Sequence, residues 1–387
     1  MKKLLATLVL SLGVTTLAQA QSSVAIYGIM DMGLLGKTLK GTPATATNTS
    51  TTEQFGQNGQ TLNRLGFRGN EDLGGGTSAF FVLETGLTPS SSSMSGMNNR
   101  QSFIGLAQKG LGRVALGTQY TPIFNAVRDT DPGQLNNVIG SVIYQANGPT
   151  GGQQSPDASF TLRFNNALTV STERFKGFSA NAALSINNSD STQTAAATGG
   201  TNNKTDFGVG VDYTWNKLYA VVAYQNLFSN VAGATPAVSS AATGTVGATG
   251  ITYVPAFTAT HARDEQLYAG ATYDFGKFKA FAGYTDRKIT SNTSNATQMN
   301  RTAQQIGVRG YLTKTVEGWA SAGNGRYSAF GAGQPYSDFT AYQVGANYWM
   351  SKRTNLYAIA GTTQTSQTSN TSALSGNMYA AGIRHTF

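Results

Sequence analysis

Residues 206–215 read DFGVGVDYTW and decide the fold class. Polar or small residues take one alternating set of positions, and the other set is Phe207, Val209, Val211, Tyr213 and Trp215. Because successive strand side chains point to opposite faces, these residues indicate a strand with one apolar face. That face ends in two aromatics of the kind found at membrane–water interfaces, and the pattern recurs along the chain. It predicts a transmembrane β-barrel.

Other segments repeat the alternation, and short turns alternate with long loops rich in Ser, Thr, Asn and Gly. The predicted strands are 22–36, 59–71, 77–87, 98–108, 112–120, 158–173, 177–188, 204–215, 217–228, 263–275, 277–290, 300–312, 316–327, 339–350, 353–365 and 376–387. The predicted long loops are 37–58, 88–97, 121–156, 189–203, 229–261, 291–299, 328–338 and 366–375. Short turns at one end and long loops at the other are typical of a 16-stranded, all-β, antiparallel outer-membrane barrel. At this strand number the interior is wide enough for an aqueous channel.

The composition agrees with a barrel. Only 12% of the residues are charged, against about a quarter in ordinary globular chains. The mean hydropathy is −0.21, which suits a wall with lipid on one face and water on the other. The sequence has no Cys, which excludes disulfides, thiolate metal sites and Cys nucleophiles.

The first 20 residues have the pattern of a secretory signal peptide. Lys2 and Lys3 form a basic start, residues 4–14 are apolar, and residues 18–20 (AQA) form a small-residue cleavage site. The apolar run is too short for a transmembrane helix. We therefore expect residues 1–20 to be cleaved and residues 21–387 to form a single barrel domain.

The sequence offers little chemistry for catalysis. It has two histidines, His261 and His385, and neither a G-x-S-x-G nor an H-E-x-x-H motif. The net charge is +9, but the basic residues are spread along the chain, which argues against nucleic-acid binding. We expect no enzyme activity and no cofactor.

Five blocks of sequence resemble the Gram-negative general porins of beta-proteobacteria. They are residues 23–28 (SVAIYG), 64–76 (RLGFRGNEDLGGG), 116–122 (LGTQYTP), 348–357 (YWMSKRTNLY) and 382–387 (GIRHTF). The resemblance implies a homotrimer of 16-stranded barrels in the outer membrane. It also implies that the third extracellular loop, about residues 121–156, folds into the lumen and narrows it to an eyelet.

Several residues of this loop become eyelet candidates through the resemblance. They are Arg128, Asp129 and Asp131, together with Tyr120 just before the loop. The chain departs from the family pattern at Gln119, where the family usually has a basic residue. It departs again at Gly133, where the family usually has an aromatic residue after the Asp-Pro pair.

The resemblance also implies a basic wall opposite the loop, and Arg64, Arg100 and Arg163 match it by motif. Alternation supports two of them. If Leu65 and Phe67 face lipid, Arg64 and Arg68 face the lumen. In the same way, if Leu162 and Phe164 face lipid, Arg163 faces the lumen. Arg100 shares the face of Ile104, so its direction stays open. A charge on the lipid face would cost about 2–4 kcal/mol at mid-bilayer, which favours the lumen for all three. The alternative is ordinary solvated arginines in a wet lumen.

Asp31 and Glu84 also read as lumenal, either in the eyelet or as solvated wall carboxylates. In the last strand, Tyr379, Ile383 and Phe387 share one face. The resemblance implies that this terminal pattern is read by the outer-membrane barrel assembly machinery, although it is also what any lipid-facing strand shows. Outer-membrane lipid and lipopolysaccharide are the expected surroundings.

The sequence therefore predicts passive diffusion of small hydrophilic solutes and ions through a water-filled pore. Three wall arginines against few loop acids predict a mild anion preference. A solute-specific channel stays open as an alternative, and a barrel enzyme or an adhesin with a closed lumen is less favoured. The loops at 229–260 and 366–375 contain no charged residue, and the sequence gives no functional reason for this.

Overall fold

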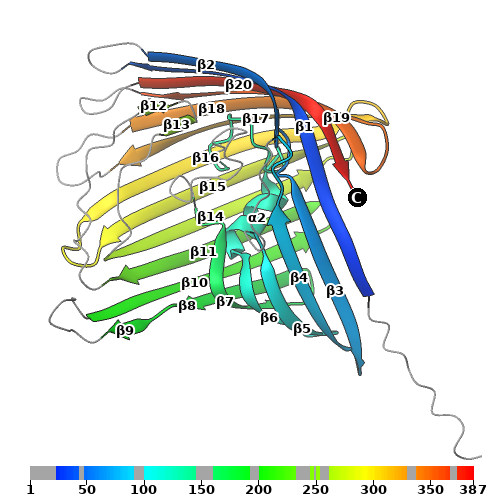
Figure 1. Ribbon diagram of the computed structural model, residues 1–387, viewed down its shortest axis with the longest axis vertical. Helices are drawn as coiled ribbons and strands as arrows, with labels where there is room; N and C mark the ends of the chain where they lie inside the picture. Colours follow the sequence, from blue (N-terminus) through cyan, green and yellow to red (C-terminus); the bar gives the residue numbers. More distant parts are fainter. Residues whose placement is uncertain are drawn as a thin grey trace, which may run out of the picture.

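A computed structural model describes residues 23–42, 48–90, 100–144, 160–191, 200–231, 245–247, 250–252, 261–328, 337–366 and 373–387. Its wall is a closed antiparallel barrel of 16 strands, which confirms the predicted fold class. Figure 1 shows the first and last strands side by side. The strand β1 (Ser23–Thr42) pairs with β20 (Ala373–Thr386) from Ile29 opposite Thr386 to Thr42 opposite Ala373, so these two strands close the barrel.

The remaining strands follow in chain order. They are β2 (Asn48–Gln57), β3 (Arg64–Gly74), β4 (Thr77–Gly86), β5 (Ser102–Gln108), β6 (Gly112–Tyr120), β7 (Arg163–Thr172), β8 (Phe178–Ile186), β9 (Ser189–Ser191), β10 (Gly200–Trp215), β11 (Leu218–Asn230), β12 (Thr245–Gly247), β13 (Gly250–Thr252), β14 (Ala262–Asp274), β15 (Phe278–Ser291), β16 (Thr297–Tyr311), β17 (Val316–Ser328), β18 (Ser337–Trp349) and β19 (Thr354–Thr365). The described helix is α2 (Pro122–Thr130). No helix in the described ranges is both long and apolar enough to cross a membrane.

Some of these strands are parts of one wall strand. Both β2 and β3 pair with β1, one with its later half and one with its first residues, so together they form the second wall strand. Likewise β8 and β9 both pair with β10. The hairpin β12–β13 forms a separate two-stranded sheet.

The two faces of the wall differ as the alternation predicts. Val209 and Ile306 are exposed on the outside, whereas Gln266 and Gln305 are buried inside. Lipid contact favours apolar side chains outside, and polar side chains inside can bond one another or the lumen. The opening stretch, 206–215, lies within β10.

The element boundaries differ from the sequence prediction near the N-terminus. The predicted loop at 37–58 is largely the hairpin of β1 and β2, and the strand predicted at 59–71 begins only at Arg64. Between them, residues 58–63 leave the wall and turn inward, starting at Asn58 with a φ of 66°. Farther on, β5 begins at Ser102 and not at 98, and β7 begins at Arg163 and not at 158.

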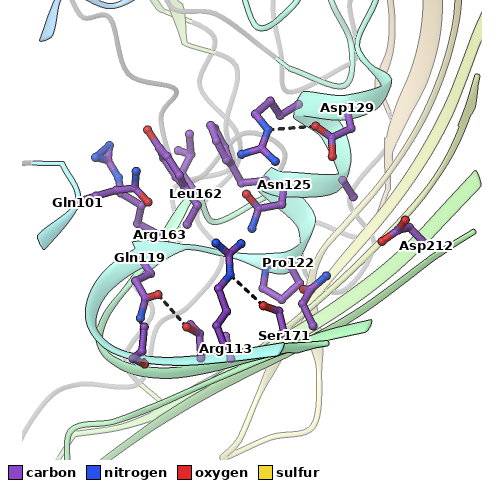
Figure 2. A pocket seen from close by; sticks show the side chains of 18 of the residues that line it. Gln101, Arg113, Gln119, Pro122, Asn125, Asp129, Leu162, Arg163, Ser171 and Asp212 are labelled. Atoms are coloured by element: carbon purple, nitrogen blue, oxygen red, sulfur yellow. Dashed lines mark hydrogen bonds and ion pairs between the residues drawn. The ribbon is translucent and has the colours of Figure 1, made fainter. Parts of the chain in front are cut away.

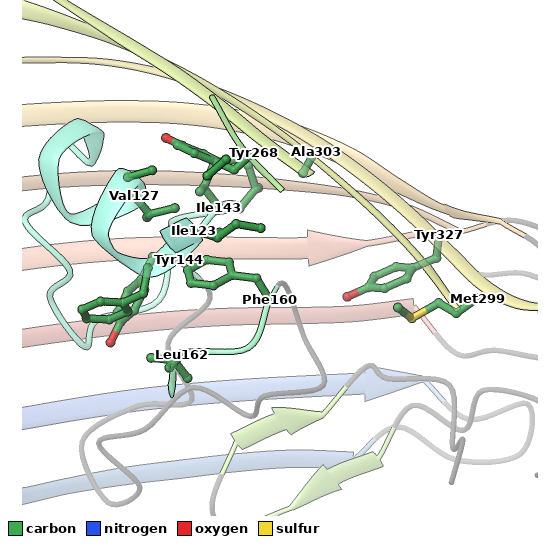
Figure 3. Close-up of a cluster of buried hydrophobic side chains, with 14 of the residues drawn as sticks. Ile123, Val127, Ile143, Tyr144, Phe160, Leu162, Tyr268, Met299, Ala303 and Tyr327 are labelled. Atoms are coloured by element: carbon green, nitrogen blue, oxygen red, sulfur yellow. The ribbon is translucent and has the colours of Figure 1, made fainter. Parts of the chain in front are cut away.

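The third loop enters the barrel as the helix α2. Thr121 caps the helix, because its hydroxyl accepts a hydrogen bond from the Phe124 amide at 3.2 Å, and Pro122 fits the first turn. The helix contacts β10, β11, β14 and β15. Figure 3 shows Ile123 and Val127 of the helix beside Tyr268 of β14, within the apolar cluster that anchors the loop.

After the helix, the loop follows the inner wall. Arg309 of β16 donates to the Pro132 carbonyl at 2.9 Å, Gln343 of β18 to the Val138 carbonyl at 2.9 Å, and Arg301 of β16 to the Val142 carbonyl at 2.5 Å. A Cβ on the wall residue Gly361 would overlap the Ile139 carbonyl oxygen. The loop therefore lies against β10–β19 and leaves space on the opposite side of the lumen. Residues 145–156 of the predicted loop lie outside the described residues.

Candidate pore constriction

A cavity of about 840 Å³ lies between α2 and the inner face of β3–β8 (Figure 2). Its polar and charged lining makes it the water-accessible part of the lumen beside the third loop. The charged residues that line it are Arg64, Arg100, Arg113, Arg128, Arg163, Asp129, Glu173 and Asp212. Arginines thus outnumber carboxylates on its surface.

The predicted basic wall forms one connected cluster around Glu84. Arg100 donates from Nε to Glu84 Oε1 at 2.5 Å, and Arg64 Nη1 lies 3.6 Å from Glu84 Oε2. The Tyr27 hydroxyl donates to the same carboxylate at 3.2 Å. Glu84 and Arg100 are buried, whereas Arg64 reaches the lumen. The negative charge of Glu84 therefore offsets the repulsion between the positive charges of Arg64 and Arg100 and lets them lie close together.

Tyr120 links this cluster to the third loop. Arg100 Nη2 donates to the Tyr120 hydroxyl at 2.6 Å. The Tyr120 ring stacks on Phe124 of α2 with centroids 4.0 Å apart, and Arg163 Cζ lies 5.6 Å from its centroid. Contact between a guanidinium and an aromatic face is favourable and fixes the orientation of the arginine. Tyr120 thus positions two arginines relative to α2.

The loop side of the cavity carries charges of both signs. Arg128 and Asp129 project from α2 and form an ion pair at 3.1 Å, with about half of each side chain exposed. A pair this exposed adds little stability, but both charges stay in the water of the lumen. Figure 2 shows Asp129 across the cavity from Arg163.

Besides Glu84, three predicted eyelet residues do not line this cavity. Arg68 lies four positions beyond Arg64 on β3, with Cζ 5.4 Å from the centre of the Tyr27 ring. Asp31 is fully buried and bonded to Gln60, Thr61 and Tyr357. It is therefore neither exposed in the eyelet nor a solvated wall carboxylate, the two alternatives left open by the sequence.

Asp131 is the third of these residues and anchors the loop. It lies in the third loop, outside the membrane-spanning strands, and accepts hydrogen bonds from the Leu135 amide at 2.7 Å and from Gln305 at 3.3 Å. Burial raises the pKa of its carboxyl to about 6, because desolvation outweighs these bonds and nearby Arg309.

The terminal residues lie on the outside of the barrel. Tyr379, Ile383 and Phe387 are each almost half exposed along the outer face of β20. The Phe387 amide donates to the Gly28 carbonyl at 3.1 Å, which ties the last residue to β1.

The alternation argument for Arg163 starts from a wrong premise. Leu162 lines the cavity and Phe164 is buried beside Ala167 and Ala183, so neither faces lipid. The register of β6 and β7 shifts between Gly117 and Gln119, and Asn166 has a φ of 50°. A bulge of this kind reverses the faces on its far side. Arg163 nevertheless lines the cavity, as the motif match implies.

The sequence prediction missed three charged residues of the cavity, Arg113, Glu173 and Asp212. Two were readable. Arg113 alternates with the outward Val114 and Leu116, and Asp212 lies on the polar face of residues 206–215. Asp212 also forms an ion pair with Arg174. Within the described residues, no group of three or more His, Asp or Glu side chains is placed to hold a metal ion.

A closed barrel of this size, with a charged and water-accessible lumen beside an inward loop, defines the class of channel-forming outer-membrane barrels. The chain belongs to the Gram-negative porin family, whose model matches residues 6–368. It is an outer-membrane porin that crosses the Gram-negative outer membrane many times and forms a channel. Proteins of this family are channels and not enzymes.

Individual relatives agree with the family match. An outer membrane porin protein of Bordetella pertussis is 28% identical over 92% of this chain and 93% of its own length. The anion-selective porin from Comamonas acidovorans superposes with a TM-score of 0.68 at 21% identity, covering 95% of this chain and all of that one. A trimer form of OmpT from Vibrio cholerae superposes with a TM-score of 0.59 at 14% identity, over 95% of this chain and 99% of that chain. Because both identities are low, at 21% and 14%, the likeness to these two structures shows a shared fold and nothing further.

Proposed function

We propose that the porin lets small hydrophilic solutes and ions diffuse passively, with a mild preference for anions. The observation that carries the preference is the cavity lining, where five arginines face three carboxylates. Charged side chains at a constriction attract ions of opposite sign and repel the others. The preference is mild because the buried carboxylate of Glu84 offsets part of the charge of Arg64 and Arg100. The Comamonas porin, described as anion-selective, supports the same direction.

The site roles follow from this proposal. Arg64, Arg100 and Arg163 form the basic wall of the eyelet, Arg113 adds to it, and Arg128 and Asp129 form the loop side. Reversal potentials across a KCl gradient in planar bilayers test the preference. We expect anion selectivity in the wild type and its loss when Arg64, Arg113 and Arg163 are all replaced by Gln. A cation-selective wild type would refute the proposal.

We further propose the assembly that the family resemblance implies. The chain would lose residues 1–20 on export and form a homotrimer in contact with outer-membrane lipid and lipopolysaccharide. The face of Tyr379, Ile383 and Phe387 would be read by the barrel assembly machinery. The trimer form of the Vibrio OmpT supports the oligomeric state. Channel closure in three equal conductance steps would test it.

We also propose that the chain has no catalytic activity. Its two histidines lie at opposite ends of the wall, His261 just before β14 and His385 on β20. Because they lie at opposite ends of the barrel wall, His261 and His385 cannot both belong to one catalytic site. Assays on lipid and peptide substrates test this.

A further inference from the structure

The lumen contains a second inward segment besides the third loop. Residues 58–63, called here the inner turn, join β2 to β3 and leave the wall between Gln57 and Arg64. The inner turn is well buried, with Asn58, Gln60 and Asn63 less than a tenth exposed. Two of its other residues, Thr61 and Leu62, line the same cavity as the basic wall. The inner turn is therefore part of the surface that a permeating ion meets.

Asp31 of β1 holds the inner turn in place. Its Oδ2 atom accepts hydrogen bonds from the Gln60 amide at 2.8 Å and the Thr61 amide at 2.5 Å. Its Oδ1 atom accepts from the Tyr357 hydroxyl at 2.6 Å. A carboxylate that accepts two successive backbone amides fixes the path of that backbone.

The third loop holds the inner turn from the other side. The Asn137 side chain donates to the Asn58 carbonyl at 2.7 Å, and the Asn137 amide donates to the Gly59 carbonyl at 3.2 Å. Asn137 is buried at this contact. Its neighbours on either side in the loop bond Gln343 of the wall instead. Asn137 thus joins the two inward segments directly.

The inner turn leads straight into the basic wall. Arg64, the first residue of β3, donates from Nε to the Leu62 carbonyl at 3.3 Å. Arg64 then faces Glu84, Glu84 binds Arg100, and Arg100 binds Tyr120 at the start of the third loop. These contacts form a closed circuit around the cavity: third loop, Asn137, inner turn, Arg64, Glu84, Arg100, Tyr120 and back to the loop.

We propose that the inner turn is a second constriction element and that Asn137 and Asp31 are positioning residues for Arg64. The described part of the third loop, residues 121–144, does not complete the rim of the pore. The inner turn fills the interval between Asn137 and Arg64, so the contact between the two inward segments sets both the pore width and the place of the Arg64 charge. The part of this inference that concerns selectivity rests on the proposed anion preference, whereas the part that concerns pore width does not.

The first test compares Asn137→Ala with Asn125→Ala in the full-length porin reconstituted in planar bilayers. Asn125 is a matched control, because it also belongs to the third loop and lines the cavity, yet within the described residues its side chain makes no bond to the inner turn. We expect Asn137→Ala to increase open-channel noise and to shift the reversal potential toward zero, in the direction of Arg64→Gln. Asn125→Ala leaves the contact between the third loop and the inner turn intact, so we expect it to change both values less than Asn137→Ala does.

A double-variant cycle separates a positioning role from a merely structural one. If Asn137 acts through Arg64, Arg64→Gln changes the reversal potential less in the Asn137→Ala background than in the wild type. Equal shifts in both backgrounds, or an Asn137→Ala channel with wild-type noise and selectivity, would overturn the inference. A wild type without anion preference would refute the proposed function and leave the noise and conductance to decide this inference.

A second variant, Gly59→Ala, tests the inner turn by adding a methyl group on its wall side. A Cβ on Gly59 would lie 2.5 Å from the Tyr357 hydroxyl and 3.0 Å from Ala380 Cβ, both on the wall side. Gly59→Ala should therefore push the inner turn into the lumen and lower the single-channel conductance. An unchanged or higher conductance in a correctly folded Gly59→Ala channel would contradict the inference. If that variant does not fold, the Asn137 pair decides alone.

Discussion

Arg100 and Tyr120 are joined by a hydrogen bond of 2.6 Å from the guanidinium to the phenol oxygen, and this bond couples the basic wall to the third loop. The same guanidinium binds Glu84, and the same phenol ring stacks on Phe124 of α2. The position of the arginines in the lumen therefore depends on the seating of the loop helix. Packing against Tyr120 and Glu84 therefore fixes the position of Arg100 in this porin.

Replacing Tyr120 by Phe should separate the two contacts of this residue. The variant keeps the stack on Phe124 and loses the bond to Arg100. A hydrogen bond to a charged group contributes about 1.5–3 kcal/mol, so we expect a loss of stability within this range. Tyr120→Ala should cost more, because it also removes the ring that Phe124 and Arg163 contact. Urea unfolding followed by tryptophan fluorescence measures both. Equal stability of Tyr120→Phe and the wild type would show that the bond is not formed.

The pair of Arg100 and Glu84 should be the most sensitive point of the basic wall. Arg100→Gln leaves the buried Glu84 carboxylate with the Arg64 cation 3.6 Å away and the hydrogen bond from the Tyr27 hydroxyl. Breaking a buried ion pair on one side costs about 3–5 kcal/mol. The double variant Arg100→Gln with Glu84→Gln removes both charges and should recover most of this loss.

Unfolding of both variants measures the difference, and Arg113→Gln is the control. Arg113 also lines the cavity, but its side chain is exposed and donates from Nε to the Ser171 hydroxyl at 3.0 Å. Its replacement should change stability by about 0.5 kcal/mol or less. A double variant no more stable than Arg100→Gln would contradict the explanation.

The wall of this porin was predictable from sequence because lipid and water select opposite side chains at every second position. Val209 and Leu267 show this pattern, and both face outward in the structure. Alternation holds only inside a regular strand, however. Counting back from Ile104 would place Arg100 on the lipid side, but β5 begins at Ser102, so Arg100 lies before the strand and turns inward. The motif match, and not periodicity, identified this residue.

The inward path of residues 58–63 could not be predicted from the sequence for a different reason. Residues 59–71 read as one strand. The Asn58-Gly59 pair at its start is a turn signal, but it does not show that the turn extends to residue 63 or that it points into the lumen. The interruption depends on Asp31, Asn137 and Tyr357, which are distant in sequence and meet only in the closed barrel. The sequence places Asp31 on the lumenal face, in the eyelet or as a solvated wall carboxylate, because its buried partners cannot be read from the sequence. Buried polar networks of this kind are set by tertiary structure.

Lowering the pH should increase the anion preference through Asp131. Burial raises the pKa of this carboxyl to about 6, whereas an ordinary aspartate titrates near pH 4. As the pH falls from 7 to 5, Asp131 takes up a proton and loses its negative charge, so the lumen becomes more positive and anions are favoured. Reversal potentials measured at pH 7, 6 and 5 would follow this step. Asp131→Asn should show the low-pH selectivity throughout, and a step that persists in this variant would assign it to another group.

Adding one methyl group to Gly361 should displace the third loop. A Cβ there would overlap the Ile139 carbonyl oxygen, so either the loop or β19 has to move. Overpacking of this kind costs about 1–3 kcal/mol, and the loop is the element that can yield. We therefore expect Gly361→Ala to lower the stability by this amount and to reduce the single-channel conductance as the loop moves into the lumen. Gly318→Ala on β17 is the matched control, because the nearest atoms would lie 3.7 Å from its Cβ, an ordinary contact distance. If both variants conduct like the wild type, the loop is not seated against the wall at Gly361.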